Sequence, residues 1–87
     1  MQIIKINAIW CSACLITNPR FNEIIKDYPN IEVIEYDYDE YPDIVEKYQI
    51  GTIIPVFIIL ENGIEKKRLI GEKSKKEISD FLESSCL

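Results

Sequence analysis

The chain has 87 residues, of which 47% are hydrophobic, and it carries a formal net charge of −5 with no histidine. Most domains have about 100–150 residues, so we expect residues 1–87 to form one domain with a small core. The lack of histidine excludes Ser-His-Asp and Cys-His catalysis and histidine-ligated metal sites. The acidic balance argues against nucleic acid as a partner.

The first two predicted elements are a strand and a helix. Residues 3–9 are rich in β-branched side chains, which predicts a buried strand. Residues 12–28 place apolar side chains at helical spacing, with Leu15 and Ile16 in the apolar stripe. Pro19 lies inside this helix, and we expect it to kink the helix.

The rest of the chain predicts a strand, a short helix, two further strands and a last helix. These elements lie at residues 31–38, 41–48, 56–60, 65–70 and from residue 74 onward. The Asn62-Gly63 dipeptide favours a tight hairpin turn, and Ser74 with Glu77 forms a capping box at the last helix. The order β-α-β-α-β-β-α predicts an α/β fold with a four-stranded mixed sheet, a parallel first strand pair and helices on both faces.

Cys11 and Cys14 lie where the first strand meets the first helix. Free N–H groups at a helix N-terminus stabilise an anion, which favours a thiolate at Cys11. The three-residue spacing brings both sulfurs onto one helix face, and we expect Cys11 to be exposed and Cys14 to be shielded. This arrangement suits thiol–disulfide exchange, in which a thiolate attacks a substrate disulfide and a second thiol releases the product.

The cysteine pair has two other interpretations, a structural zinc half-site and an inert CxxC. Zinc takes four ligands, and the others would have to come from Cys86, a carboxylate or another chain, so we predict no metal and no cofactor. Cys86, near the C-terminus, is expected to be a bystander, although an exposed thiol there could form intermolecular disulfides.

The location predicted from the sequence is the cytoplasm. The N-terminus shows no signal-peptide pattern, and the longest apolar run is too short to cross a membrane. In the cytoplasm a CxxC is more often redox-active or metal-binding than structural.

The sequence resembles the thioredoxin family over nearly its whole length. The segment at residues 10–14, Trp-Cys-Ser-Ala-Cys, looks like the family's active site with Ser-Ala in place of Gly-Pro, and Pro19 matches its helix-kinking proline. The other matching segments are residues 36–39 with Pro42, residues 47–50, Ile54-Pro55, Asn62-Gly63 and Gly71. The extra N-terminal strand and helix of full-length thioredoxins are missing, so the resemblance implies a minimal thioredoxin-like fold.

The resemblance also implies a function, a thiol–disulfide oxidoreductase that reduces protein disulfides. Cys11 would be the exposed nucleophile and Cys14 the resolving thiol. Pro55, if its peptide bond is cis, would lie beside the cysteines, with Ile54 offering backbone hydrogen bonds to an extended substrate and Trp10 flanking the site. The alternatives are an ordinary strand-entry proline and a tryptophan packed on the core. The implied partners are protein disulfides and a thioredoxin-reductase-like electron donor, and we expect a monomer.

The chain departs from the family at three places. Lys5 stands where thioredoxins have a buried aspartate, and Glu35 stands where they have the lysine that faces it. Neighbouring parallel strands would bring these side chains together, so we predict a partly buried pair that relays the proton of Cys14; the alternative is two solvated charges. The loop at residues 51–55 is one residue longer than the family's, and Val56 replaces a threonine, so the substrate groove is expected to differ.

Charge is unevenly distributed along the chain. Residues 32–46 hold seven carboxylates and no Lys or Arg, whereas residues 66–76 hold six of the ten basic residues. Two solvated faces are the ordinary interpretation, and a docking surface for a partner is the sharper one. The tyrosines at residues 36, 38, 41 and 48 are expected to pack on the core and its edge. The competing functional prediction is a redox-sensing or partner-binding module without general reductase activity.

Overall fold

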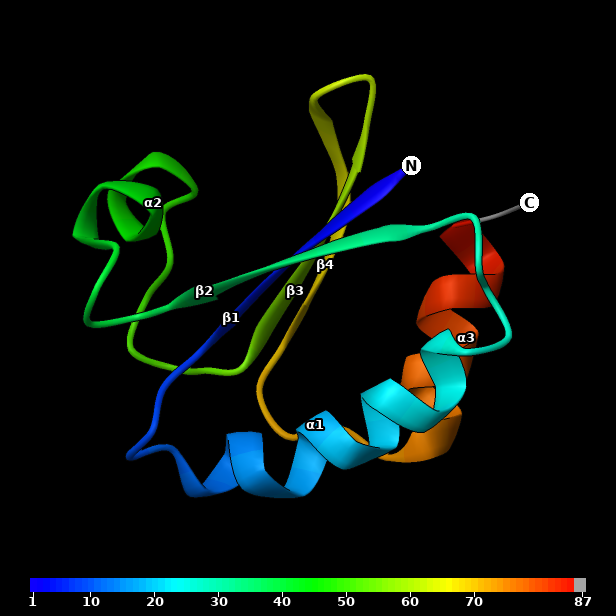
Figure 1. The fold of residues 1–87 in the computed structure, drawn as a ribbon, viewed down its shortest axis with the longest axis horizontal. Coiled ribbons are helices and arrows are strands. Elements are labelled where there is room, and N and C mark those ends of the chain that lie inside the picture. The colour runs from blue at the N-terminus through cyan, green and yellow to red at the C-terminus, as the bar shows by residue number, and fades with distance from the viewer. Residues whose placement is uncertain (86–87) are drawn as a thin grey trace.

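The computed structural model describes residues 1–85, and its elements follow the predicted order (Figure 1). The strands are β1 (Gln2–Asn7), β2 (Glu32–Asp37), β3 (Val56–Glu61) and β4 (Ile64–Ile70), and the helices are α1 (Ser12–Ile25), α2 (Pro42–Lys47) and α3 (Lys75–Ser85). The sheet order is β2-β1-β3-β4, with β1 and β2 parallel and the other neighbours antiparallel. The predicted four-stranded mixed sheet is confirmed.

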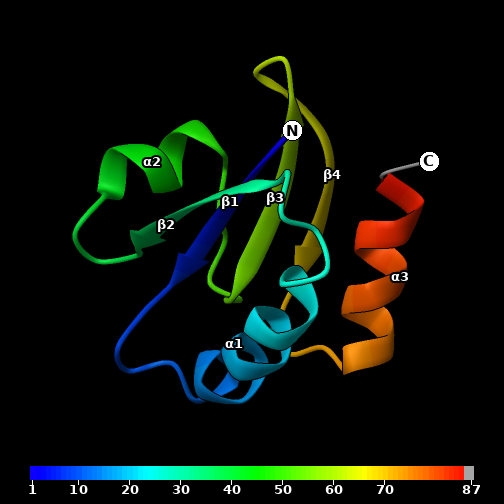
Figure 2. The same ribbon diagram turned by 45° about the vertical axis from the view of Figure 1, so that its right-hand side comes forward.

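The two faces of the sheet are covered by different helices (Figure 2). Successive side chains of a strand point to opposite faces. Ile4 and Ile6 therefore belong to a cluster on the side of α2, whereas Ile3 belongs to a second cluster with side chains of α1 and α3. In the second cluster the rings of Phe21 and Phe57 stack with their centroids 4.6 Å apart. The prediction of helices on both faces is confirmed.

The boundaries of β1 and α1 differ from the predictions. β1 ends at Asn7, and the N–H of Cys11 then bonds to the carbonyl oxygen of Ala8 at 3.2 Å. This tight turn directs Ile9 outward, so that it is 90% exposed rather than part of a buried strand. α1 ends at Ile25, because the next N–H groups bond to carbonyl groups three residues back instead of four.

The apolar stripe of α1 was predicted wrongly at two positions. Leu15 and Ile16 are exposed, and the buried face of the helix consists of Cys14, Thr17 and Phe21. Thr17 can be buried because its hydroxyl oxygen accepts a hydrogen bond from the segment before α3. A polar residue with such a partner can occupy the packed face of a helix, and a prediction based only on the spacing of apolar residues misses it.

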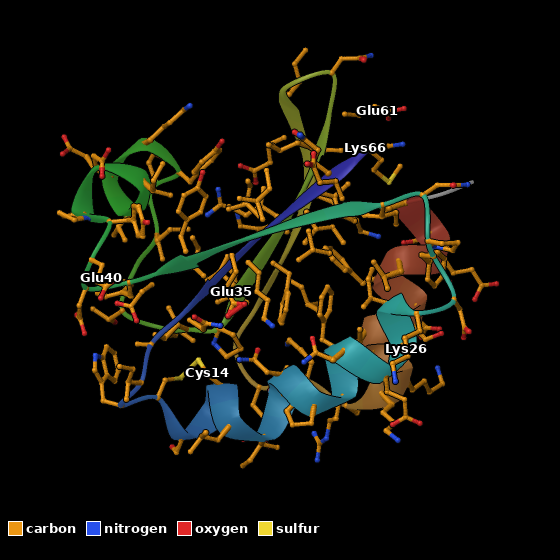
Figure 3. All side chains as sticks on the ribbon, viewed as in Figure 1. Cys14, Lys26, Glu35, Glu40, Glu61 and Lys66 are labelled. Atoms are coloured by element: carbon orange, nitrogen blue, oxygen red, sulfur yellow. A yellow bond between two sulfur atoms is a disulfide. The ribbon has the colours of Figure 1, made fainter. Side chains whose placement is uncertain are left out.

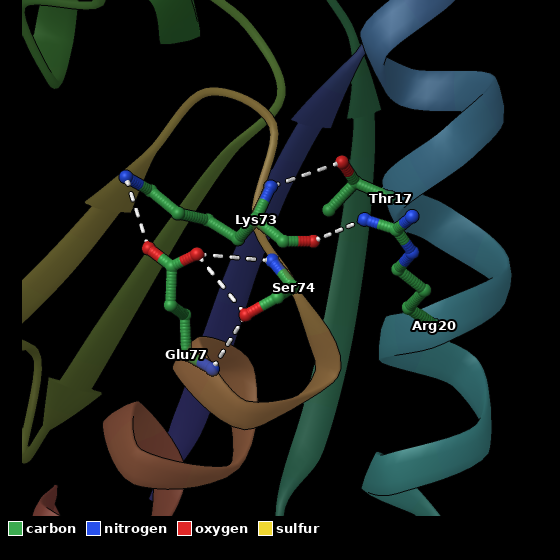
Figure 4. Close-up of polar contacts among 5 residues, drawn as sticks. All are labelled: Thr17, Arg20, Lys73, Ser74 and Glu77. Atoms are coloured by element: carbon green, nitrogen blue, oxygen red, sulfur yellow. Dashed lines mark hydrogen bonds and ion pairs between the residues drawn. The ribbon is translucent and has the colours of Figure 1, made fainter.

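The segment before α3 is tied to α1 by polar contacts (Figure 4). The backbone N–H of Lys73 donates to Thr17 Oγ1 at 3.4 Å, and Arg20 Nη1 donates to the Lys73 carbonyl oxygen at 2.9 Å. The predicted capping box is confirmed: Glu77 N–H donates to Ser74 Oγ at 3.2 Å, and Ser74 N–H donates to a Glu77 carboxylate oxygen at 3.2 Å. These contacts fix the start of α3 against the middle of α1.

The tyrosines pack as expected. Tyr36, Tyr38 and Tyr48 are partly buried against the cluster on the α2 side. Tyr41 is 43% exposed and meets the ring of Tyr36 edge-on at 5.0 Å. Within residues 1–85, none of the helices has the length and apolar character needed to cross a membrane.

Candidate active site

Cys11 and Cys14 form a disulfide at the N-terminus of α1, with their Cα atoms 5.2 Å apart. Cys11 is the N-cap residue, with an extended backbone, and its Sγ accepts a hydrogen bond from the N–H of Cys14 at 3.1 Å. The first turn of α1 contains no acidic residue, so no carboxylate within that turn competes for its free N–H groups. Once the disulfide is reduced, this position favours the thiolate form of Cys11.

Both cysteines are buried in the disulfide state. Cys11 is 5% exposed and Cys14 is 2% exposed, so the prediction of an exposed Cys11 is wrong for this state. The cause is the loop before β3, whose Ile54 carbonyl oxygen lies 3.5 Å from Cys11 Sγ. A disulfide sulfur has no proton to donate, so this approach is a packing contact that covers the sulfur.

The loop that covers Cys11 contains a cis peptide bond between Ile54 and Pro55. Both residues are buried, and the Pro55 carbonyl oxygen accepts a hydrogen bond from the N–H of Gly71 at 2.8 Å. The loop is therefore held by the end of β4 on one side and packs against the disulfide on the other. The structure thus brings Ile54 and the cysteines together.

Trp10 lies at the surface beside the disulfide and is 60% exposed. Its indole Nε1 donates to Asp39 Oδ2 at 2.6 Å, and its ring meets Tyr38 edge-on at 6.0 Å. Asp37 holds this loop in place, because its Oδ1 accepts hydrogen bonds from the N–H groups of Asp39 and Glu40. The sequence analysis missed the role of Asp39 in orienting Trp10; the signal was an aspartate two residues after the end of a strand, in a turn-forming segment.

Three more large apolar side chains next to the site are exposed. Ile9 is 90% exposed, Leu15 73% and Ile53 63%. Each lies within two residues of Cys11, Cys14 or Ile54 in the chain, so the segments that flank the disulfide carry exposed apolar side chains, Trp10 included. Exposed apolar side chains on such segments are available for contact with other molecules.

Lys5 and Glu35 are direct partners in the register of β1 and β2, and their side chains approach to 3.9 Å between Nζ and Oε2. The Lys5 side chain is only 5% exposed and its Nζ lies 5.5 Å from the centre of the Phe21 ring, whereas Glu35 is 55% exposed. Burial lowers the pKa of Lys5, and the charge of Glu35 opposes that shift. The Glu35 carboxylate also accepts a hydrogen bond from Asn7 Nδ2 at 2.6 Å.

A cavity of about 540 Å³ lies between the start of α1 and the end of β2. Cys14 and Glu35 both line it, together with Asn7, Asn18 and Glu40. Figure 3 shows Glu35 on the side of β2 that faces Cys14. The sequence analysis missed Asn7 and Asn18, although each is polar at a position whose periodicity places it beside a predicted site residue.

A zinc site at Cys11 and Cys14 would need further ligands beside them. Among residues 1–85, no group of three or more Cys, Asp or Glu side chains is arranged to hold a metal ion. Cys86, the predicted bystander, lies outside the described residues.

A reducible disulfide at the start of a helix, packed against a buried cis-proline loop at the end of a mixed sheet, defines a class: this chain is a thiol–disulfide oxidoreductase. Comparison with known proteins gives the family. The thioredoxin family model matches residues 1–84. The chain belongs to the thioredoxin family.

Two relatives and one solved structure illustrate the likeness. The thioredoxin of Mycoplasma genitalium is 34% identical over 91% of this chain and 76% of its own length. A thioredoxin H-type of Fagopyrum esculentum is 31% identical over 82% of this chain, which spans only 60% of that relative. The structure of thioredoxin 1 from Thermosipho africanus TCF52B matches with a TM-score of 0.83 and 27% identity, covering 99% of this chain and 94% of that one.

Proposed function

We propose that this chain works in the cytoplasm as a single-domain, monomeric reductant of protein disulfides and that a thioredoxin-reductase-like donor returns it to the dithiol. One observation carries the proposal: Cys11 Sγ occupies the N-cap of α1 and accepts a hydrogen bond from Cys14 N–H. A sulfur at that place is stabilised as an anion, which is the attacking form in thiol–disulfide exchange.

The reaction proceeds in two exchanges. The Cys11 thiolate attacks one sulfur of a substrate disulfide, so that a Cys11–substrate bond forms and the other substrate sulfur leaves as a thiolate. Cys14 then loses its proton and attacks Cys11 Sγ, which releases the second substrate sulfur and leaves the Cys11–Cys14 disulfide. The substrate gains two electrons, and the two cysteines lose them.

The proton of Cys14 has an acceptor nearby in this proposal. Glu35 lines the same cavity as Cys14, and Lys5 beside it has a pKa lowered by burial. The Glu35 carboxylate takes the proton when Cys14 becomes the attacking thiolate, and Lys5 would do so only in its neutral form. The two residues thus act as a proton relay under the site.

Substrate binding is assigned to the surface around the disulfide. Trp10 offers an exposed apolar face beside Cys11. The Ile54 backbone, next to Pro55, points its carbonyl oxygen at Cys11, so that an extended substrate lying across the sulfur would meet that backbone. Contact of the substrate with Trp10 and the other exposed apolar side chains on the flanking segments would exclude water from the exchanging sulfurs.

The test of the proposed function is reduction of insulin by dithiothreitol with and without the chain. We expect the chain to accelerate the reduction and Cys11→Ser to abolish the acceleration. A Cys14→Ser variant should trap substrates on Cys11 as mixed disulfides. A chain that gives no acceleration over dithiothreitol alone, with a reactive Cys11, would instead be a redox-sensing or partner-binding module.

The relay is tested separately with Glu35→Gln. We expect resolution of a preformed mixed disulfide to slow by about tenfold or more at neutral pH, since a positioned base contributes at least that much. Glu32→Gln, on the same strand but outside the lining of the cavity, is the matched control. Equal resolution rates across the pH range in the two variants would rule out a role for Glu35.

A further inference from the structure

Asn18 lies on α1 one turn after Cys14, and both residues line the cavity that also contains Glu35. The Asn18 oxygen Oδ1 is fully buried, and none of the described residues places a hydrogen-bond donor within reach of it. Buried polar atoms in folded proteins almost always have a partner, and an unpaired acceptor raises the free energy of the state that contains it. In the disulfide form, no described protein group donates a hydrogen bond to Asn18 Oδ1.

Reduction creates a donor at the right place. In the disulfide Cys14 Sγ carries no proton, whereas the Cys14 thiol is an S–H donor. Side chains at positions i and i+4 of a helix are neighbours, with Cβ atoms roughly 5–6 Å apart. Breaking the Cys11–Cys14 bond also frees the Cys14 sulfur to turn away from Cys11 and toward the cavity.

We propose that Asn18 is a positioning residue whose Oδ1 accepts a hydrogen bond from the Cys14 thiol in the reduced state only. The inference rests on the proposed function and adds a residue to it. The hydrogen bond stabilises the dithiol relative to the disulfide. It also holds the proton on Cys14, so that Cys11 is the sulfur that ionises.

The exchange with a small dithiol shows where the proton goes. Dithiothreitol donates two electrons and becomes a cyclic disulfide, while the Cys11–Cys14 bond breaks. Of the two protons that leave dithiothreitol, one ends on Cys14 and is shared with Asn18. The other protonates Cys11 or enters solvent when Cys11 is a thiolate.

The proposal predicts the direction in which the redox equilibrium moves. Replacing the amide by an apolar group removes the unsatisfied acceptor from the disulfide form and removes the hydrogen bond from the dithiol form. Both changes favour the disulfide, so the variant becomes a stronger reductant. A residue that only stabilised the fold would affect both redox states alike.

The experiment compares Asn18→Leu with Asn22→Leu, which makes the same exchange at an exposed position one turn further along α1. Both are equilibrated with oxidised and reduced dithiothreitol. We expect Asn18→Leu to shift the equilibrium threefold to tenfold toward the disulfide, tenfold being about 30 mV, and Asn22→Leu to leave it unchanged. Urea unfolding of both redox forms should show the same effect. The difference in the free energy of unfolding between the oxidised and reduced forms should be larger in Asn18→Leu than in the wild type.

Two further variants keep the proposal open to refutation if Asn18→Leu does not fold. Asn18→Ala removes the same amide without adding bulk and should shift the equilibrium in the same direction, whereas Asn18→Gln keeps an amide oxygen and should largely restore the wild-type value. The proposal would be overturned if the substitutions changed the free energy of unfolding of the two redox forms equally. It would also be overturned if the redox equilibrium were unchanged in both Asn18→Leu and Asn18→Ala. Its failure is distinct from failure of the proposed function, because wild-type insulin reduction would persist.

Discussion

The N-termini of α1 and α3 are built on the same hydrogen bond with different acceptor atoms. In α3 the oxygen of Ser74 accepts from the N–H three residues on at 3.2 Å, and in α1 the sulfur of Cys11 accepts from the N–H three residues on at 3.1 Å. In α3 a carboxylate, Glu77, completes the cap (Figure 4). In α1 the first turn has no acidic residue.

The difference shows how one local structure supports two roles. An oxygen cap with a carboxylate beside it satisfies the free N–H groups permanently and stabilises the fold. A sulfur cap without a carboxylate leaves the same N–H groups to stabilise a charge that appears only when a disulfide opens.

The largest effect is expected from Cys11→Ser, which gives α1 the oxygen cap of α3. Disulfide reduction should fall to the rate of dithiothreitol alone, because a serine hydroxyl does not take part in disulfide exchange. The helix should remain, since serine is a favourable N-cap residue. Insulin reduction and far-ultraviolet circular dichroism measure the two outcomes, and loss of the helical signal would contradict the comparison.

Ser74→Ala removes the oxygen cap of α3. We expect the free energy of unfolding to fall by about 1 kcal/mol, as for other N-cap replacements, with the rate of insulin reduction unchanged. Urea unfolding measures the loss. Ser79→Ala, inside the same helix, is the control and should not destabilise the chain.

Ser12→Glu places a carboxylate in the first turn of α1, as Glu77 does in α3. The helix should become slightly more stable, because a negative charge near its N-terminus is favourable. Cys11 should form less thiolate, and its alkylation by iodoacetamide at neutral pH should slow by about two- to fivefold, the range set by such charges. Ser12→Gln is the neutral control, and a faster reaction in Ser12→Glu would contradict the model.

The smallest expected effect is a change in how the free energy of unfolding depends on pH in the acid range. Hydrogen bonds from Ser74 and the charge of Lys73 lower the pKa of Glu77. A carboxylate with a lowered pKa stabilises the fold at pH values above its ordinary pKa, and this contribution is lost as the pH falls through the lowered value. Between pH 5 and pH 3 the free energy of unfolding, measured with urea, should therefore fall less in Glu77→Gln than in the wild type, and an equal fall in both would contradict the prediction.

The order of elements was predictable because each carries a strong local signal. Runs of β-branched residues gave the strands, Asn62-Gly63 gave the hairpin, and Ser74 with Glu77 gave the start of α3. The errors concern side-chain direction. Ile9 follows the β-branched run but lies in the turn after it, and Leu15 fits helical spacing but faces outward beside the disulfide. In both cases an apolar residue is at the surface, where pattern rules expect burial.

The site was predictable where it depends on sequence neighbours and less so where it depends on tertiary contacts. Trp10, Cys11 and Cys14 lie within five consecutive residues, and the structure places them together. The burial of Cys11 was missed, because it is caused by a loop more than forty residues away. Asn18 was missed because its importance depends on tertiary structure: its Oδ1 is buried without a hydrogen-bond donor from residues 1–85, in the lining of a cavity shared with Glu35.

The order of the sheet has a consequence for contacts between copies of the chain. β2 and β4 lie at the two edges. β2 carries Glu32, Glu35 and Asp37, whereas β4 carries Lys66, Lys67 and Arg68 against one glutamate. Two copies that paired through the same edge would bring like charges opposite each other, which opposes pairing of β2 with β2 and of β4 with β4. The edges of two different kinds, β2 of one copy and β4 of another, carry opposite charges, so any sheet shared between copies would join an acidic edge to a basic one.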